Sequence, residues 1–254
     1  MIQLKTTLLA LLSISQTTAE CTRDSLLLAA QTYISTQTTG TLSTLALSQN
    51  FTYRENNKII DLKKGILVSP LKITFNRSTA DTTACASYTN LIVLTPKPYV
   101  ISTQIRHDSG TGISMIDSIV ATTKDLFFNA TLTQSYLRAE NWGVQTAPVN
   151  RDLLKRVGDA YLDMWTDAKA ADSIPWGTDC ERVEGSKLTR PCGGQLPHGG
   201  STKPNGMRRY VIDELVGSVD VLCAFDSLGN MPDSHEIRVE GGKVKYVHTV
   251  TVLA

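Results

Sequence analysis

Two matching stretches decide the fold of this chain: Ile113–Ile119, which reads ISMIDSI, and Val244–Val250, which reads VKYVHTV. The second stretch follows the first at an offset of 131 residues. Other matches occur in the same order at nearly the same offset: Arg23-Asp24 with Arg151-Asp152, Tyr33 with Tyr161, Arg54 with Arg182, and Ile105-Arg106 with Ile237-Arg238. Such a series indicates two copies of one supersecondary unit.

Each copy begins with a helical pattern and continues with strand patterns. Apolar side chains recur at helical spacing after Thr22 and after Asn150, which are good N-cap residues. The segments that follow, around Phe51–Arg54 and Trp176–Glu184, are expected to be irregular. Strands are expected at Ala86–Thr95, Tyr99–His107 and Ile113–Val120 in the first copy, and at Arg209–Asp213, Val219–Phe225, His235–Glu240 and Lys243–Val252 in the second. Gly241-Gly242 predicts a tight hairpin between the last two.

This order of elements predicts the α+β class, with two tandem cone-shaped units, residues 20–145 and 146–254. In each unit a helix packs on a curved antiparallel sheet, and small molecules commonly bind between such a helix and sheet. Alternation along the last strand groups His248 with Val244 on one apolar face, so His248 is expected to point inward. Asp117 occupies the matching position in the first copy, which makes both residues candidate site residues.

The first nineteen residues predict a secretory signal peptide. Lys5 supplies a positive charge, Leu8–Ile14 an apolar core, and Thr17-Thr18-Ala19 the small residues before a cleavage site after Ala19. We therefore expect a secreted or lumenal protein. The sequons at Asn50, Asn76 and Asn129 are usable glycosylation acceptors in that compartment.

Secretion makes the five cysteines interpretable as a disulfide framework with one thiol left over. Cys180 and Cys192 enclose a loop rich in Gly and Pro and form the best local pair; Cys21 and Cys85 are the next pair. Cys223 lies in an apolar strand and is expected to be a free, buried thiol.

Composition excludes several classes of function. The chain has 25 basic and 24 acidic side chains, and this near-neutral balance argues against a nucleic-acid partner. No apolar run is long enough for a membrane span. Neither a CxxC nor an HExxH motif is present, so the sequence supports no metal site.

The second copy also carries motifs that resemble a family. The strings Pro175–Gly185, PWGTDCERVEG, and Met231–Val239, MPDSHEIRV, followed by Gly241-Gly242-Lys243 and His248, resemble a family of secreted fungal tandem NTF2-like (SnoaL-like) proteins. The motifs cover about residues 150–254, and the first copy lacks them. The whole chain is similar to the fungal hetero-Diels–Alderases of tropolone sesquiterpenoid pathways.

The resemblance implies a cycloaddition that joins a tropolone o-quinone methide to humulene without a cofactor. Its substrates would be small apolar polyketide and terpene molecules, and homodimerisation is expected on the same ground. Catalysis would consist of holding two partners in one reactive pose and donating a hydrogen bond to the tropolone oxygen. We name His248, Arg182 and Tyr161 as candidate donors. Candidate substrate-binding residues are Trp165, Trp176, His235, Tyr246 and Asp117.

Each candidate also has a purely structural explanation. His248 can be a buried, hydrogen-bonded core residue, and Arg182 can belong to an ion pair with a neighbouring glutamate. Tyr161 and Trp165 form an apolar helical stripe of the kind that usually lies in a core. Along an extended strand Asp233, Ser234 and His235 cannot form a triad, so Asp233 and Ser234 are expected to form a turn, while His235 shares a face with Ile237. The Gly-rich run from Cys192 to Gly200 is expected to be a mobile flap.

Two other functions remain open from the sequence. One is an acid/base isomerase, cyclase or dehydratase that uses His248 and Asp117 as its two titratable groups. The other is a secreted protein that binds apolar ligands without turnover.

Overall fold

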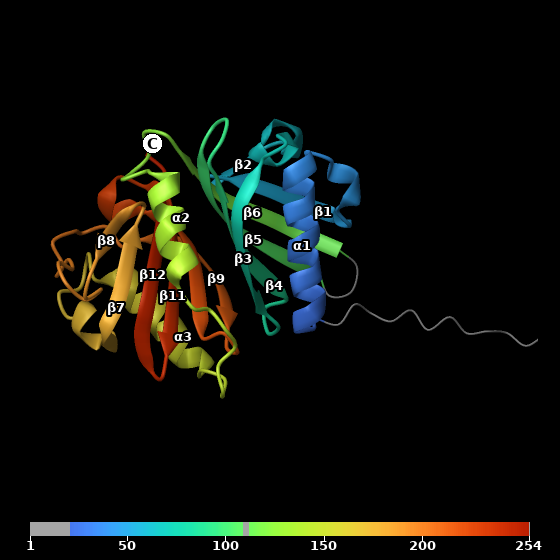
Figure 1. Ribbon diagram of the computed structural model, residues 1–254. Coiled ribbons are helices and arrows are strands. Elements are labelled where there is room, and N and C mark those ends of the chain that lie inside the picture. Colours follow the sequence, from blue (N-terminus) through green and yellow to red (C-terminus); the bar gives the residue numbers. More distant parts are fainter. Residues whose placement is uncertain (1–20, 109–111, 254) are drawn as a thin grey trace, which may run out of the picture.

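The computed structural model describes residues 21–108 and 112–253, which form two units of the same design (Figure 1). In the first unit a helix precedes a six-stranded sheet in the order β2-β1-β6-β5-β4-β3. Its elements are α1 (Arg23–Thr39), β1 (Leu47–Glu55), β2 (Lys58–Ile59), β3 (Ile73–Asp81), β4 (Ala86–Val93), β5 (Tyr99–Asp108) and β6 (Gly112–Thr122).

The second unit repeats this plan with the equivalent strand order β8-β7-β12-β11-β10-β9. Its elements are α3 (Arg151–Asp163), β7 (Trp176–Glu184), β8 (Lys187–Thr189), β9 (Gly206–Asp213), β10 (Ser218–Phe225), β11 (Met231–Glu240) and β12 (Lys243–Thr251). A further helix, α2 (Ala130–Ala139), connects the units. The identical order confirms the predicted tandem α+β organisation.

Both sheets are mixed, so the expectation of purely antiparallel sheets is wrong. β1 runs parallel to β6, and β7 runs parallel to β12. The segments Phe51–Arg54 and Trp176–Glu184, expected to be irregular, therefore lie in β1 and β7, each the second strand from one edge of its sheet. Polar residues in both segments hid the strand pattern: Arg54 of β1 pairs with Asp117, and Arg182 of β7 pairs with Glu184.

The helices begin where the sequence predicts. The Thr22 hydroxyl accepts the Ser25 N–H, and the Asn150 side chain accepts the Leu153 N–H, so each helix has its N-cap. Each helix covers one face of its own sheet and closes a core there. At Gly158 of α3 an added Cβ would lie 3.1 Å from a Val221 methyl carbon, so the glycine lets this helix lie close to β10.

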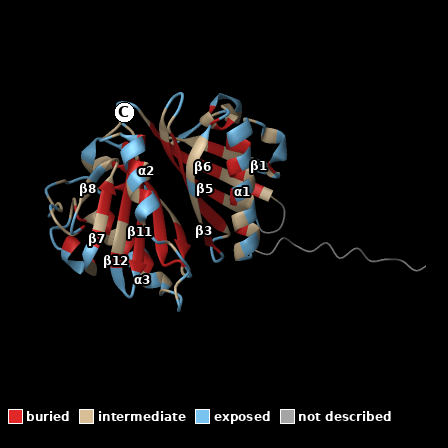
Figure 2. Cartoon of the chain, in the orientation of Figure 1, coloured by how far each residue is buried: buried red, intermediate tan, exposed pale blue. Residues whose placement is uncertain are grey.

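The opposite faces of the two sheets pack against each other (Figure 2). Ile119 from β6 and Val250 from β12 belong to one buried cluster with Leu137 of α2, which therefore seals one side of this junction. The molecule thus has three layers of apolar core: one under α1, one between the sheets, and one under α3.

Two reciprocal ion pairs tie the units together. Arg23 of α1 bonds Asp213 of β9 at 2.5 Å, and Arg151 of α3 bonds Asp81 of β3 at 2.8 Å. Each aspartate is buried and also accepts a backbone N–H of the other unit, from Ala80 and Ile212 respectively. In each pair the arginine comes from the helix of one unit and the aspartate from a strand of the other. The chain therefore folds as an internal dimer with an approximate two-fold axis.

The predicted cysteine framework is confirmed. Cys21 bonds Cys85, Cys180 bonds Cys192, and Cys223 is a buried free thiol. The three sequon asparagines Asn50, Asn76 and Asn129 are exposed, as glycosylation requires. The predicted signal peptide lies outside the described residues. Among the helices of the described chain, none combines the length and the apolar character that crossing a membrane would need.

Loss of one reciprocal pair should destabilise the whole molecule. Arg151→Ala leaves the Asp81 carboxylate buried without its cation, which costs about 3 kcal/mol at such sites. Urea unfolding followed by tryptophan fluorescence measures this loss. The control is Arg156→Ala, which removes an exposed arginine from the same helix and should change the free energy of unfolding by less than about 0.5 kcal/mol. Equal effects of the two changes would contradict the importance of the pair.

Candidate functional site

The structure places the predicted site residues on two different faces of the second sheet. Tyr161, Trp165, Trp176 and His235 meet on the face that α3 covers. Tyr246 and His248 lie on the face that meets the first unit, beside Trp142 of the connection.

The prediction that His248 points toward the helix is wrong because the strand is irregular. The pairing of β12 with β7 shifts register between Val244 and Tyr246. Val244 and Val247 consequently pack under α3, while His248 turns toward Arg77 of the first unit. A simple count of alternating residues does not see this irregularity.

Aromatic rings surround His235 on the α3 face. Its ring lies 5.2 Å from the Tyr161 ring and 5.6 Å from the Phe225 ring, measured between centroids. Trp165 meets Phe225 edge to face at 4.6 Å, and Trp176 lies 6.4 Å from Tyr161. We call these five residues the His235 cluster. Tyr161 and His235 are fully buried, whereas both tryptophans are half-buried at its edge.

Polar atoms of this cluster have no hydrogen-bond partner among the described residues. They are the Tyr161 hydroxyl and both ring nitrogens of His235. Burial of an unpaired polar group costs about 1–3 kcal/mol, so a folded protein retains several such groups together for a reason. Burial, with the Glu184 carboxylate as a lesser cause, raises the pKa of Tyr161 well above its ordinary value, so the hydroxyl stays protonated and able to donate.

The first unit provides an internal comparison. Tyr33, Thr103 and Ser118 occupy the positions that Tyr161, His235 and Thr249 hold in the second unit. There the Tyr33 hydroxyl is hydrogen-bonded to Thr103 at 2.8 Å, and Thr103 is hydrogen-bonded to Ser118 at 2.8 Å, so the three hydroxyls form a continuous chain. The same fold therefore pairs the tyrosine hydroxyl in the first unit, and leaves the Tyr161 hydroxyl and both His235 ring nitrogens unpaired in the second.

Asp233 is a site residue that the sequence analysis missed. It was expected to form a turn, but it lies within β11, fully buried, on the same face as His235. Its Oδ2 lies 3.3 Å from His235 Nε2, and its Oδ1 accepts from the Thr251 hydroxyl. Ser234 points to the opposite face, where it donates to Asp220, so no triad forms. The alternation Asp233, His235, Ile237 would have revealed this shared face.

Arg182 holds the flap in place. Its guanidinium donates to the carbonyls of Cys192 and Gly194 and lies 3.3 Å from Glu184. The segment 190–205, which contains the predicted flap, lies over the two tryptophans. The Gly193 backbone packs on the Trp176 ring, and the Ser201 N–H donates to the Trp165 carbonyl. Arg182 is therefore a structural residue beside the cluster, as its ion-pair alternative predicted. The Cys180–Cys192 disulfide ties one end of the flap to β7.

Arg182 is not the structural counterpart of Arg54, although the sequence match aligned them. Arg54 pairs with Asp117 across β1 and β6, whereas Val183 pairs with His248 at the corresponding place. The true offset here is one residue larger. Arg54 consequently lies on the face between the units, and Arg182 lies on the α3 face.

His248 belongs to a charged network between the units. Its Nε2 lies 2.7 Å from a Glu140 oxygen, and its Nδ1 lies 3.2 Å from a Glu236 oxygen. Arg77 from β3 bonds both carboxylates, and its guanidinium lies 3.7 Å from the Trp142 ring centroid. Burial opposes protonation of His248, but the two carboxylates outweigh burial and raise its pKa; the pKa values of Glu140 and Glu236 are lowered in turn.

Asp117 has a comparable role in the matching position. It is buried between Arg54 of its own unit and Arg209 of the other, at 2.9 Å from each. Asp117 and His248 are therefore residues of the junction between units. They do not meet in one site, which removes the geometric basis for using them as an acid–base pair.

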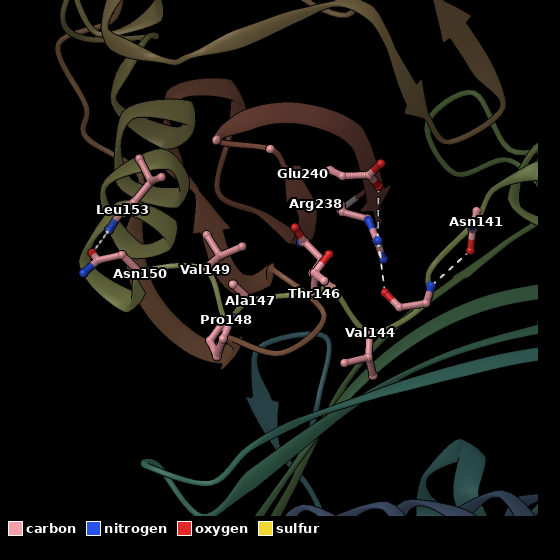
Figure 3. Close-up of a pocket in the computed structure, with 14 residues that line it drawn as sticks. Asn141, Val144, Thr146, Ala147, Pro148, Val149, Asn150, Leu153, Arg238 and Glu240 are labelled. Atoms are coloured by element: carbon pink, nitrogen blue, oxygen red, sulfur yellow. Dashed lines mark hydrogen bonds and ion pairs between the residues drawn. The ribbon is translucent and has the colours of Figure 1, made fainter.

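A separate groove of about 620 Å³ lies between the connection that follows α2 and the β11–β12 hairpin (Figure 3). Arg238 crosses it and donates to the Gly143 carbonyl and to Glu240. None of the predicted catalytic residues lines this groove. The described residues contain no group of three or more His, Cys, Asp or Glu side chains that could hold a metal ion.

Comparison with known proteins singles out the second unit. A family described as Domain of unknown function (DUF8021) matches residues 147–251, from just before α3 to the end of β12. A search of curated proteins finds no match to this chain. The matched span contains the whole His235 cluster and leaves out the first unit, where the equivalent positions are hydrogen-bonded.

Matched tyrosine changes in the two units test the unpaired hydroxyl. Tyr33→Phe removes a satisfied hydrogen bond and should destabilise the protein by about 1 kcal/mol. Tyr161→Phe removes a buried hydroxyl without a partner and should leave stability unchanged or increase it. Chemical denaturation of both variants gives the two values, and a comparable loss in Tyr161→Phe would show that its hydroxyl is satisfied after all.

The network around His248 should make stability depend on pH. Because its folded pKa is raised, the stabilisation is complete below about pH 6.5 and is lost as pH rises through the folded value. The lowered pKa values of Glu140 and Glu236 make their contribution complete above about pH 4.5 and lost at lower pH.

We expect the free energy of unfolding to fall as the pH rises above about 6.5, and we expect this fall to be smaller in His248→Gln. The control is His198→Gln, which replaces an exposed histidine and should keep the wild-type dependence of the free energy of unfolding on pH. A wild-type slope in His248→Gln would rule out this residue as the source.

Proposed function

We propose that the second unit binds a flat, largely apolar small molecule at the His235 cluster and converts it by acid–base catalysis. The observation that carries the proposal is the set of buried, unpaired polar atoms on Tyr161 and His235, at positions that the first unit satisfies internally. Substrate polar groups would supply the missing partners, and the rings of Trp165, Trp176 and Phe225 suit a flat apolar body.

His235, Asp233 and Tyr161 have different roles in the proposed reaction. His235 accepts a proton from the substrate, while Asp233, whose Oδ2 lies 3.3 Å from Nε2, stabilises the charged form of the ring. The Tyr161 hydroxyl donates a hydrogen bond to the oxygen on which negative charge develops. Return of the proton from His235 to a second atom completes an isomerisation, and its transfer to a departing hydroxyl completes a dehydration.

A hetero-Diels–Alder cycloaddition is the second candidate. The aromatic wall supports it, because Trp165 and Phe225 meet at 4.6 Å and present ring faces and edges against which two apolar partners can be held in one pose. Tyr161 would then donate to the tropolone oxygen and polarise the heterodiene. The proposed partners are a tropolone o-quinone methide and humulene.

Two assays test these functions. Tropolone, a flat hydroxyketone, should quench the fluorescence of the tryptophans in a saturable manner. The quinone methide is then generated in situ with humulene, with and without protein, and the products are resolved by chiral chromatography. Faster formation of one stereoisomer, with a rate nearly independent of pH, supports the cycloaddition. Protein-dependent loss of water or movement of a double bond, with a bell-shaped pH profile, supports acid–base catalysis.

Variants identify the site. His235→Gln should lower the acid–base rate by about 100-fold or more, and Tyr161→Phe should lower either reaction. Tyr33→Phe makes the same change in the first unit and should retain the wild-type rate. Unchanged rates in both His235→Gln and Tyr161→Phe would place the reaction elsewhere. Absence of both tropolone quenching and any rate effect would refute both functions.

A further inference from the structure

A second groove between the units is open, whereas the equivalent region in the other half of the junction is filled by the chain itself. The open groove, of about 480 Å³, lies where the β1–β2 turn of the first unit meets the start of β9 and the end of β12. Its lining includes Asn56, Asn57, Met207, Pro232, Val252 and Leu253.

The approximate two-fold axis relates this groove to a region on the other half of the junction. Pro232 and Val252 correspond to Val100 and Ala121, at offsets of 132 and 131 residues. Asn56 of the β1–β2 turn corresponds to Gly185 of the β7–β8 turn, and both residues have positive φ. The two regions are thus built from the same backbone positions.

In the other half, the chain's own segment 125–139 fills this region. Ala130 and Leu137 of α2 are buried in one cluster with Val100 and Ala121, and Phe75 and Phe128 pack against that cluster. The remaining space there is about 10 Å³.

The segment 125–139 is held by hydrogen bonds to the turn as well as by apolar contact. The Thr133 hydroxyl donates to the Gly185 carbonyl at 2.7 Å, and the Ser186 N–H donates to the Phe127 carbonyl at 2.9 Å. An added Cβ on Gly185 would lie 2.5 Å from the Leu126 carbonyl oxygen, so the occupying backbone lies directly on the turn. Polypeptide is therefore the material that this architecture accommodates.

No described segment fills the open half. Met207 is 49 % exposed and Leu253 is 45 % exposed, whereas Val100 and Ala121 in the other half are buried. The groove is continuous with the junction between units, since Asp125 accepts both the Thr122 N–H and the Leu253 N–H at the shared edge. Lys58 is the charged residue of the lining, and it favours an acidic group on an occupant.

We propose that this groove is the docking site for a polypeptide segment of a partner protein with the chemistry of residues 125–133: an acidic residue, then an aromatic side chain three residues later, then a hydroxyl five residues after the aromatic one. The aromatic side chain lies on Met207, Pro232 and Val252. The hydroxyl donates to the Asn56 carbonyl, as Thr133 donates to the Gly185 carbonyl in the occupied half. The acidic residue pairs with Lys58.

The probe is a fluorescein-labelled peptide with the sequence of residues 124–139, KDLFFNATLTQSYLRA, added to the intact protein. Fluorescence anisotropy should show saturable binding to one site. Met207→Glu places a charge in the groove without disturbing a core, since this side chain is half exposed, and should weaken binding at least tenfold. Leu28→Glu, at a 69 % exposed position on α1, is the matched control and should bind like the wild type.

Three results would overturn the proposal. The first is no binding at millimolar peptide concentration. The second is binding that Met207→Glu does not weaken, because the peptide would then be replacing the chain's own α2 in the occupied half. The third is displacement of the bound peptide by tropolone, which would assign the groove to small molecules. A peptide with Asp in place of Phe128 and Val in place of Thr133 should not bind.

Discussion

Charges buried between the two sheets determine which face of each unit is available for chemistry. Asp81 and Asp213 each find a cation and a backbone N–H on the other unit, and His248, Glu236 and Arg77 are joined across the same junction. A buried carboxylate without such partners is strongly unfavourable, so the part of this face that carries these charges has to stay closed. The helix-covered faces remain, and under α3 the Tyr161 hydroxyl and both His235 ring nitrogens are unpaired, whereas Tyr33 and Thr103 of the first unit are hydrogen-bonded to each other.

The comparison between the units explains why one of them is the better candidate for function. In the first unit Tyr33, Thr103 and Ser118 satisfy one another, which is what stability alone favours; burial raises the pKa of Tyr33 to about 12. In the second, a histidine and an aspartate replace a threonine and an isoleucine, and hydrogen bonds are lost. Positions that break local rules without a structural gain are typical of functional sites. Because the unit occurs twice, the second copy can lose these hydrogen bonds while the first keeps them.

The sequence predicted those features that depend on residues close together in the chain. The helix caps at Thr22 and Asn150, the Gly241-Gly242 hairpin and the local disulfide all follow from short-range chemistry. The inward direction of His235 was also predicted correctly, because β11 is regular from Asp233 to Arg238. The direction of His248 could not be predicted, because it depends on a register shift between two strands. The partners Glu140 and Trp142 could not be foreseen either, since no periodic pattern marks the connection that carries them.

The covalent connection through α2 has a consequence for how this junction behaves on dilution. Two separate chains joined by such a face would separate at low concentration, since their association depends on mass action. Here the second unit is always present near the first at the effective concentration that a short tether imposes. The melting temperature of the single chain should therefore be the same in nanomolar and micromolar solution. At great dilution the chain therefore retains both halves, and with them the buried charges on which its fold depends.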